Sequence, residues 1–499
     1  MVLLQAEARA QQKAADNVRA LLETALNILG GSERLAQLDD WLVEGKGREN
    51  LSAELQGLSA EAPTWRPHRE SVAVKRSGGL AVAWERRTPR NDHSLRWRRF
   101  IYKADSFGVV DFVSGNAGRS PGGTSEETRI ALMRRIPHLL LLDVSTNARG
   151  LRVRGDQLLE AEMPDMALLL RFAKNPPVLE QLEDAIYMPG LGDSHIRWRW
   201  HGWWRDRLLG YRPSGHVLTI NGKVFQEVSY TTYMSGKPEA KTLLEVPAHV
   251  DAMAGFSHSS PPVGGPAEGE VAPGVHVAEE GGFMVMFVEF HDFVVAFDAP
   301  AAAPGLESIP SSNRTQPEAV SARLRDRIAK TCPNKPVRYI VLSHHHSDHL
   351  GGGRLLAGDG TTVLAAAGDV GAVRRALVAP RTFAPGGALP TKSEVKVTGV
   401  RDRYLITDGS RPMEIINVGK NPHTRENLFA WLPQERIVLQ GDLFYYEEGA
   451  PFPPSGRQTM NRFFAHWLAA HGFKPKAIYG VHYRGAAGQE ALAIASRRK

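Results

Sequence analysis

The chain has 499 residues, which is too long for one ordinary domain and indicates two or three. Its composition, 42% hydrophobic and 23% charged, excludes a disordered chain and indicates a globular protein with ample material for a core. The 61 basic residues only slightly exceed the 54 acidic ones, so the formal charge of +7 indicates a solvated basic face, and we expect no nucleic-acid partner.

The N-terminus and the single cysteine bear on the compartment. Cys332 is the only cysteine, so an internal disulfide is excluded, and so is a metal site built from several thiolates. No stretch approaches the roughly 20 apolar residues of a membrane-spanning helix. Ala8-Arg9-Ala10 resembles a signal-peptide cleavage site behind a short apolar patch. We expect a periplasmic or secreted protein whose export signal was trimmed, with a cytoplasmic protein as the alternative.

The first half of the chain begins with a helix and continues with strands. Residues 11–30 carry apolar side chains at helical spacing and end at a Gly-Gly pair, which predicts a helix. From Trp41 to Gly115 the pattern alternates in short pieces separated by Gly, Pro, Asn and Ser. This alternation predicts an antiparallel sheet with one solvated face.

A second helical segment interrupts the strands. Thr124 and Glu127 form a capping box, which predicts a helix running towards Leu142. Further alternating strands are expected at residues 196–200, 216–220 and 224–233. A sheet wrapped around a helix is the simplest assembly of these parts.

The middle of the chain contains the expected domain boundary. Residues 257–274 are poor in apolar side chains and rich in Pro, Gly and Ser, which predicts a linker. We therefore expect an N-terminal domain over residues 1–256 and a C-terminal domain over residues 275–499. In the latter, two strands are expected before a helix at 317–330, with outer helices near 370–378 and 461–471.

The stretch Val341–Gly353, VLSHHHSDHLGGG, follows a short apolar strand with four potential metal ligands in six positions: His344, His346, Asp348 and His349. Imidazole nitrogen and carboxylate oxygen are ligands that zinc accepts. Strand alternation would place His344 and His346 on one side, with Asp348 and His349 beyond the bend facing a second ion. A solvated polar loop or a purification tag is the plain alternative, but a tag would be terminal.

These residues resemble the H-x-H-x-D-H signature of the metallo-β-lactamase superfamily, and further motifs follow in that family's order. They are His423 in NPHTREN, Asp442 in VLQGDLFYY and His482 in AIYGVHYRG. Upstream, Asp298 in FVVAFDAP resembles the family's strand-end aspartate, which braces the metal loop without binding metal. The resemblance implies a four-layered αββα sandwich with metals at one edge.

The resemblance also implies two divalent metal ions that share one aspartate. The implied ligands are His344, His346 and His423 for the first metal, Asp348, His349 and His482 for the second, and Asp442 between them. Zinc is expected, with manganese or iron as alternatives, because selection depends on geometry and supply as well as ligand type. Two close cations lower the pKa of a shared water, and Asp348 is expected to take or deliver a proton at the leaving group.

Further residues bear on the substrate. Family members with a bridging aspartate resemble esterase-like hydrolases, which implies a small-molecule ester, lactone, thioester or amide-like substrate and makes β-lactam cleavage a minor alternative. Arg425 stands where the family often has small residues, and we expect it to meet a substrate anion or a neighbouring acid. Tyr445 and Tyr446 could donate to a carbonyl oxygen or pack within the domain.

The first half, with its opening ALNILGGSERLAQLDDWLVEGKG, resembles half-barrel domains of lipoprotein-carrier type. The fold class expected for the chain is therefore α+β, with an antiparallel half-barrel before the αββα sandwich. Four tryptophans could line a groove for an apolar substrate tail or pack in the core: Trp198, Trp200, Trp203 and Trp204.

Three functions are consistent with these patterns. The first is a dinuclear metal-dependent hydrolase. The second is a lipid or lipoprotein-binding module with a vestigial metal domain, suggested by the half-barrel pattern. The third is a phosphodiesterase or nuclease, suggested by the basic charge, for which steep salt dependence of binding would be the discriminating observation.

Overall fold

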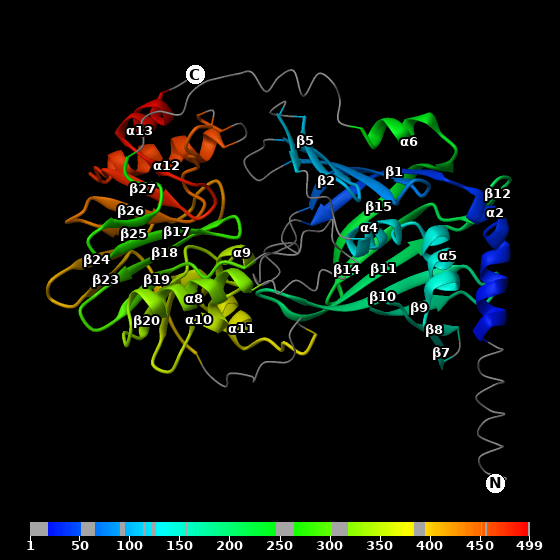
Figure 1. Ribbon diagram of the computed structural model, residues 1–499, viewed down its shortest axis with the longest axis horizontal. Coiled ribbons are helices and arrows are strands. Elements are labelled where there is room, and N and C mark those ends of the chain that lie inside the picture. Colours follow the sequence, from blue (N-terminus) through cyan, green and yellow to red (C-terminus); the bar gives the residue numbers. More distant parts are fainter. Residues whose placement is uncertain are drawn as a thin grey trace, which may run out of the picture.

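The computed structural model describes most of the chain, and every structural statement below concerns these parts: residues 18–50, 65–89, 95–112, 116–120, 126–155, 157–164, 166–245, 264–301, 318–383, 395–450, 452–454 and 457–497. Two β-rich bodies lie side by side, the N-terminal one with helices on both faces of its sheet and the C-terminal one with helices outside its sheets (Figure 1). The N-terminal part of the amphipathic helix expected at 11–30 and the capping-box residue Thr124 lie outside these ranges. A helix is present over residues 18–28.

One antiparallel sheet of 13 strands forms the N-terminal part, in the order β6-β5-β4-β3-β2-β1-β15-β14-β11-β10-β9-β8-β7. The strands run as follows: β1 Asp40–Asn50, β2 Trp65–Lys75, β3 Ala81–Pro89, β4 Leu95–Tyr102, β5 Phe107–Asp111, β6 Asn116–Ser120, β7 Gly150–Gly155, β8 Leu158–Glu162, β9 Ala167–Phe172, β10 Leu179–Met188, β11 Gly192–His201, β14 Gly215–Ile220 and β15 Lys223–Ser235. A short ribbon of β12 (Trp204–Asp206) and β13 (Gly210–Arg212) stands apart. The large antiparallel sheet predicted from the alternating pattern is confirmed.

The sheet curves around helices and buries alternate side chains on them (Figure 1). Helices α2 (Ser32–Gln37), α4 (Glu126–Met133) and α5 (Pro137–Asn147) lie on its concave side, where Leu140 and Trp198 belong to one core cluster. The convex side is covered at one end by α6 (Pro238–Leu243), which packs on Leu42 and its neighbours. Period-two alternation thus divides each strand between two faces.

The single helix expected to run towards Leu142 is two helices, so that prediction is wrong in this respect. The chain leaves α4 after Met133 and restarts at Pro137, with Ile136 in an extended conformation (φ −98°, ψ 108°). Proline has no N–H to donate and disfavours helical geometry in the preceding residue, which makes it a good first residue and a poor interior one.

The tryptophans divide between core and surface. Trp198 and Trp200 are each 2% exposed and lie in the concave core cluster, so packing accounts for them. Trp203 is partly buried against the same cluster, whereas Trp204 is 43% exposed on the separate ribbon. In the described part of the chain, the four indoles therefore do not line one common groove.

The C-terminal part contains two sheets packed face to face. The first consists of β16 (Gly269–Ala272), β17 (Val275–Glu280), β18 (Phe283–Glu289), β19 (Val294–Phe297), β20 (Val337–Val341), β21 (Thr362–Ala366) and β22 (Lys396–Val400). The second consists of β23 (Arg403–Thr407), β24 (Pro412–Asn417), β25 (Leu428–Leu432), β26 (Ile437–Gln440), β27 (Ala477–Gly480) and β28 (Ala486–Ala487). A core cluster between them joins residues of both sheets, including Met286 and Ile415.

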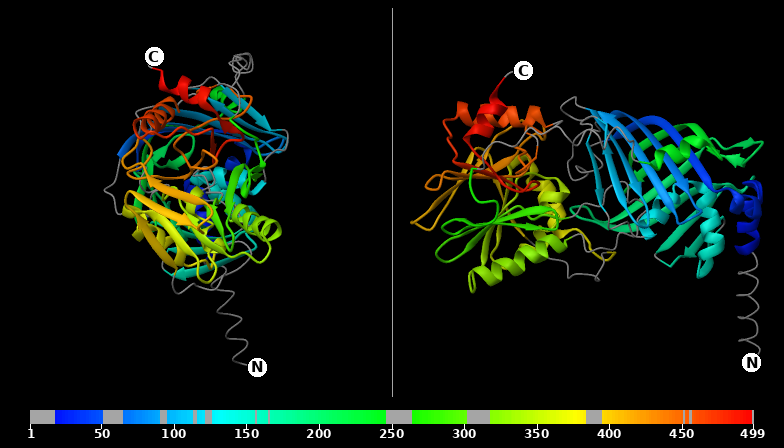
Figure 2. Two further views of the ribbon diagram at one scale, coloured as in Figure 1. Left: turned by 90° about the vertical axis from the view of Figure 1, so that its left-hand side faces the viewer. Right: turned by 45° about the horizontal axis from the view of Figure 1, so that its top comes forward.

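Helices cover the outer faces of both sheets (Figure 2). On the first sheet lie α8 (Ala319–Thr331), α9 (Ser347–Leu350), α10 (Gly353–Leu356) and α11 (Val370–Val378), and on the second α12 (Gln458–Ala470) and α13 (Gln489–Ser496). The mixed α and β fold predicted for the chain is confirmed, and its C-terminal part has the expected αββα layers. Strand β16 falls within the stretch 257–274, and the proposed boundaries of the two domains stay a prediction.

The hairpin β10–β11 joins the two bodies. Its turn brings Pro189 against Gly351, which follows the histidine-rich stretch. The Asp193 N–H donates to the Pro380 carbonyl at 2.8 Å, and its carboxylate accepts the Thr382 N–H at 2.8 Å. Nearby, Tyr187 donates its hydroxyl to Glu318, a buried carboxylate. The N-terminal sheet is therefore held against the outer helical layer beside the histidine-rich stretch.

Replacing Arg381 by alanine should strongly destabilise this junction. The Arg381 Nε lies 2.7 Å from Glu318 Oε2, with side chains only 6% and 1% exposed. Removing the cation leaves a buried carboxylate without its charge partner, which costs about 3–5 kcal/mol. Urea unfolding should show this loss, whereas Arg403→Ala, which breaks the more exposed pair with Glu414, should cost at most about 1 kcal/mol. Equal losses in the two variants would contradict a structural role for the junction.

The stability of the N-terminal part should fall in mild acid because of His138. Its ring is buried between the Tyr233 hydroxyl at 2.7 Å and the Leu209 carbonyl at 3.2 Å, and burial lowers its pKa to about 4. The unfolded chain, with a pKa near 6.5, binds the proton first. Stability is therefore complete above about pH 6.5 and is lost towards pH 4, by up to about 1.4 kcal/mol per pH unit.

Unfolding free energies measured by urea titration between about pH 7 and pH 5 test this slope. His216, whose pKa burial also lowers to about 4, contributes in the same direction. In His138→Gln we expect a shallower slope, because one of the buried histidines that resist protonation in the folded state is removed. An identical slope in the variant would show that His138 is not the titrating group.

Candidate metal centre

The potential ligands gather at one edge of the sandwich because each follows the end of a strand. His344, His346, Asp348 and His349 follow β20, and Asp298 follows its parallel neighbour β19. Asp442 follows β26, and His482 follows the parallel strand β27. The carboxyl ends of parallel strands meet at the same edge of a sheet, so residues far apart in the sequence converge there.

Three histidines form the first group. The Nε2 atoms of His344 and His423 are 3.1 Å apart, and the rings of His346 and His423 are 4.6 Å apart between centroids. Ligand atoms of all three histidines lie within 4.8 Å of one another. His344 and His346 are buried, whereas His423 is half-buried.

The second group consists of Asp348, His349 and His482, whose ligand atoms also lie within 4.8 Å of one another. The Nε2 atoms of His349 and His482 are 3.1 Å apart, and His482 Nε2 lies 3.3 Å from Asp348 Oδ2. The His349 side chain is inaccessible, whereas those of Asp348 and His482 are 22% and 25% exposed. This group therefore faces the solvent on one side.

Asp442 lies between the two groups. Its Oδ2 is 3.1 Å from His423 Nε2 in the first group, and its Oδ1 is 3.2 Å from His349 Nε2 and 3.1 Å from His482 Nε2 in the second. The structure thus brings together all seven side chains that the sequence analysis selected as ligands.

The arrangement fits cations better than hydrogen bonds. His349 Nδ1 is 2.8 Å from Asp298 Oδ2, so Nδ1 donates to that carboxylate and Nε2 faces Asp442. The carboxylates of Asp348, Asp442 and Asp298 outweigh burial and raise the pKa of His349, so this point favours a positive charge, either a proton or a bound cation. Consistently, Asp442 Oδ1 and Asp348 Oδ1 are buried without a hydrogen-bond partner. Nitrogen and oxygen donors of this kind suit divalent zinc, manganese or iron.

The positions of the donors are fixed by Asp298, which is fully buried with φ +58°. It accepts the Ser343 N–H at 2.6 Å and the Ser343 hydroxyl at 2.8 Å, besides its contact with His349. The Ser343 Oγ also lies 3.0 Å from His344 Nδ1. Outer partners of this kind set the tautomer and orientation of histidine ligands. Ser343, adjacent to the histidines, was not selected from the sequence.

Two histidines of the first group are held in the neutral form that binds a metal ion. Burial lowers the pKa of His344 and His346 well below the usual value, and neighbouring imidazoles act in the same direction. Both rings are therefore neutral at pH 7, the form in which histidine binds a metal. Burial alone would raise the pKa of Asp442, but the imidazoles of His482 and His349 outweigh it and hold that carboxyl well below its usual range.

Tyr445 lies behind Asp442 rather than in the open part of the site. It is 1% exposed and hydrogen-bonds Asp442, while Arg457 Nη1 donates to its hydroxyl at 3.0 Å. Asn461 fixes its backbone through bonds at 2.8 and 2.9 Å. Arg457 had no signal in the sequence, because it stands at the start of α12, far from any motif.

The remaining residues selected from the sequence lie further out. Tyr446 is 4% exposed and packs against Phe452 with ring centroids 5.7 Å apart. Arg425 is exposed on the loop after His423. His345, which belongs to neither ligand group, lies beside Asp369, with Nδ1 3.0 Å from Oδ1.

A separate group of potential ligands, His276, Glu289 and Cys332, also has atoms within 4.8 Å of one another. Its carboxylate is already engaged, because Lys335 Nζ lies 2.7 Å from Glu289 Oε1. Burial raises the pKa of the Cys332 thiol to about 11, which disfavours the thiolate that a metal would need.

Comparison with known proteins identifies the family of the C-terminal part. Residues 319–499 match the family model described as "Metallo-beta-lactamase superfamily". The prediction of a metallo-β-lactamase domain in the C-terminal half is thereby confirmed. Among curated protein sequences, none matches the chain. No helix of the described residues has the length and apolar character needed to cross a membrane.

Solved structures similar to this chain include the metallo-beta-lactamase FIM-1 from Pseudomonas aeruginosa in its mono-zinc form, with 20% identity, coverage of 45% of this chain and 91% of that one, and a TM-score of 0.30. The inverting sec-alkylsulfatase Pisa1 from Pseudomonas sp. has 14% identity, coverage of 46% and 40%, and a TM-score of 0.31. The rubredoxin oxygen:oxidoreductase from Desulfovibrio gigas has 15% identity, coverage of 45% and 58%, and a TM-score of 0.31.

Proposed function

We propose that this protein is a dinuclear metal-dependent hydrolase that cleaves an ester, lactone, thioester or amide-like bond in a small molecule. The observation that carries the proposal is the position of Asp442, within 3.2 Å of imidazoles from both ligand groups. One group would be held by His344, His346 and His423 and the other by Asp348, His349 and His482. Zinc is the proposed metal, with manganese or iron as alternatives.

The chain's own residues define how such a site would work. Two divalent cations, when bound, would make a shared water nucleophilic at neutral pH and polarise the bond to be cleaved. Asp298 keeps the proton of His349 on Nδ1, so that Nε2 faces the centre. Tyr445 donates towards Asp442 and, with Arg457 behind it, fixes the carboxylate between the two groups.

Asp348 is the proposed proton carrier. It lies on the open side of the centre, with its side chain 22% exposed and Oδ1 free of hydrogen bonds among the described residues. A carboxylate in this position can receive the proton released by the attacking water and deliver it to the leaving group. The substrate must approach from the same side, because the first group is largely buried.

Chelation and metal restoration test the proposal. Dialysis against a chelator should abolish hydrolysis of activated esters, lactones or thioesters, and zinc should restore it. Phosphodiesters and β-lactams belong in the same panel, since they distinguish the remaining substrate classes. Hydrolysis that survives complete removal of metal would overturn the proposal.

A further inference from the structure

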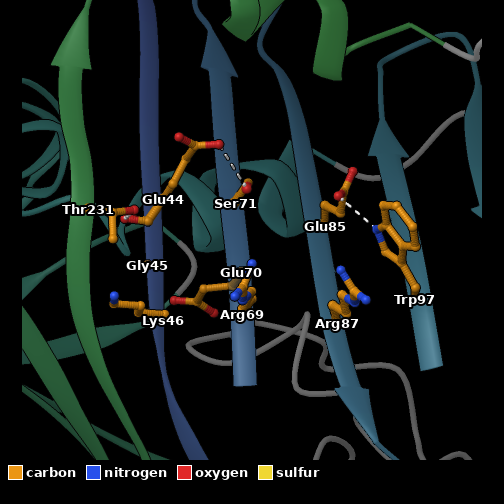
Figure 3. A pocket seen from close by; sticks show the side chains of 10 residues that line it. All are labelled: Glu44, Gly45, Lys46, Arg69, Glu70, Ser71, Glu85, Arg87, Trp97 and Thr231. Atoms are coloured by element: carbon orange, nitrogen blue, oxygen red, sulfur yellow. Dashed lines mark hydrogen bonds between the residues drawn. The ribbon is translucent and has the colours of Figure 1, made fainter. Parts of the chain in front are cut away.

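The convex face of the N-terminal sheet carries a pocket that is separate from the metal centre. It has a volume of about 450 Å³ and is lined by side chains of β1, β2, β3, β4 and β15 (Figure 3). This volume lies in the range of small-molecule sites in proteins. The pocket lies on the face that α6 covers only at its other end, over Leu42 and Ala73.

Three cations form a row across adjacent strands in this pocket. Lys46 on β1 stands directly opposite Arg69 on β2, and Arg69 stands opposite Arg87 on β3. All three side chains are exposed and line the pocket. Neighbouring strands are only about 4.8 Å apart, and like charges directly opposite one another destabilise a sheet. The row is therefore unfavourable unless a negative charge meets it.

Neighbouring arginines on the same face do have acidic partners. Arg48 Nε lies 2.6 Å from Glu227, and Arg99 Nη2 lies 2.7 Å from Glu85. Within the described part of the chain, no carboxylate pairs with Lys46, Arg69 or Arg87. The Arg87 guanidinium instead stacks on the Trp97 ring, 5.0 Å from its centroid. A bound anion would supply the negative charge that the described residues do not offer to this row.

The next row along the strands supplies acceptors and a hydroxyl. Glu44 stands opposite Ser71 and accepts its hydroxyl at 3.3 Å, and Ser71 stands opposite Glu85. Glu85 also accepts the Trp97 Nε1–H at 2.9 Å. Glu70 borders the pocket as well, but its carboxylate is bound in the interior by His68 and Gln226. An acidic row beside a cationic row matches a ligand with an anionic end and a hydroxyl-bearing end.

We propose that this pocket binds a small phosphate or sulfate monoester that carries hydroxyl groups. Its oxyanion is held by Lys46, Arg69 and Arg87, and its hydroxyls donate to Glu44. Arginine forks and lysine ammonium groups are the usual partners of such oxyanions. The site binds its ligand independently of the proposed hydrolysis.

Isothermal titration of the full chain with glycerol 3-phosphate tests the proposal. Arg69→Gln and Arg87→Gln should each weaken binding about tenfold or more, since each removes charge-assisted hydrogen bonds. Arg48→Gln is the matched control, because it removes the same charge from the same face but from a residue already paired with Glu227. Its affinity should stay within about twofold of the parent chain.

Further arms separate the alternatives. Inorganic phosphate should bind more weakly than glycerol 3-phosphate. Glu44→Gln should weaken binding of glycerol 3-phosphate but not of inorganic phosphate, so that the two affinities become more similar. The proposal would be overturned by the absence of binding at millimolar concentrations, by equal weakening in Arg48→Gln, or by binding that survives Arg69→Gln, which would place the phosphate outside this pocket. Arg69-dependent binding to phosphatidylglycerol vesicles without binding of the soluble ester would equally overturn it.

Discussion

Asp442→Ala is expected to abolish hydrolysis and to leave less than the full complement of metal in the protein. The carboxylate lies 3.1–3.2 Å from His423, His349 and His482, so its removal takes one donor from both proposed metal positions. Losing metal-based stabilisation of the reacting oxygen atoms should lower kcat/KM by about a thousandfold or more. The imidazoles remain, so partial metal binding should persist at high zinc concentrations.

Asp359→Ala is the matched control, since it removes an exposed aspartate from a turn before β21. Activity on the best substrate of the panel and metal content per chain should be measured on both variants after identical purification. The control should keep the parent values. Activity in Asp442→Ala within about tenfold of the parent chain would exclude the bridging role.

Asp298→Asn should weaken metal binding although residue 298 touches no metal position. Asparagine tolerates the positive φ at this position better than most residues, so the backbone should be kept. Its amide group donates where the aspartate accepts, so His349 Nδ1 must lose its proton and Nε2 gains it. An Nε2–H cannot bind a metal. We expect affinity to fall about 10- to 100-fold, as for other outer partners of metal ligands.

Zinc titration with a competing chromophoric chelator measures this loss directly. Asp408→Asn is the control: this carboxylate also accepts several backbone N–H groups, but in the turn between β23 and β24. It should leave zinc affinity unchanged. A normal zinc affinity in Asp298→Asn, with its fold intact by circular dichroism, would show that the His349 tautomer does not depend on Asp298.

Part of the proposed ligand set could be selected from the sequence because its signal is local. His344, His346 and His349 crowd into one strand end, and a short motif of this kind can be recognised without knowing the fold. His423 and His482 carry little signal alone, and they could be selected only through the order of motifs in the resembling family. Their convergence depends on parallel strand ends, which is a property of the fold.

Residues that act through tertiary contacts were not predictable in the same way. Arg457 at the start of α12 contacts Tyr445, and Glu318 at the start of α8 contacts Tyr187, which lies on β10 of the N-terminal body. No periodicity marks such pairs, because each depends on how two distant segments pack. The break before Pro137 is a different case. The proline is visible in the sequence as a helix-breaking signal, but the apolar pattern around it predicted a continuous helix.

The cationic row on the convex sheet was likewise hidden in the sequence. Lys46, Arg69 and Arg87 lie on three strands and read individually as solvated charges on alternating positions. Only the register of the sheet places them side by side. Composition alone could not reveal this arrangement.

The most direct test of the account is anomalous diffraction at the zinc edge from crystals of the protein loaded with zinc. The account predicts two peaks in the C-terminal domain, one contacted by His344, His346 and His423 and one by Asp348, His349 and His482, with Asp442 touching both. A single peak, or peaks whose contacts omit Asp442, would contradict the dinuclear centre.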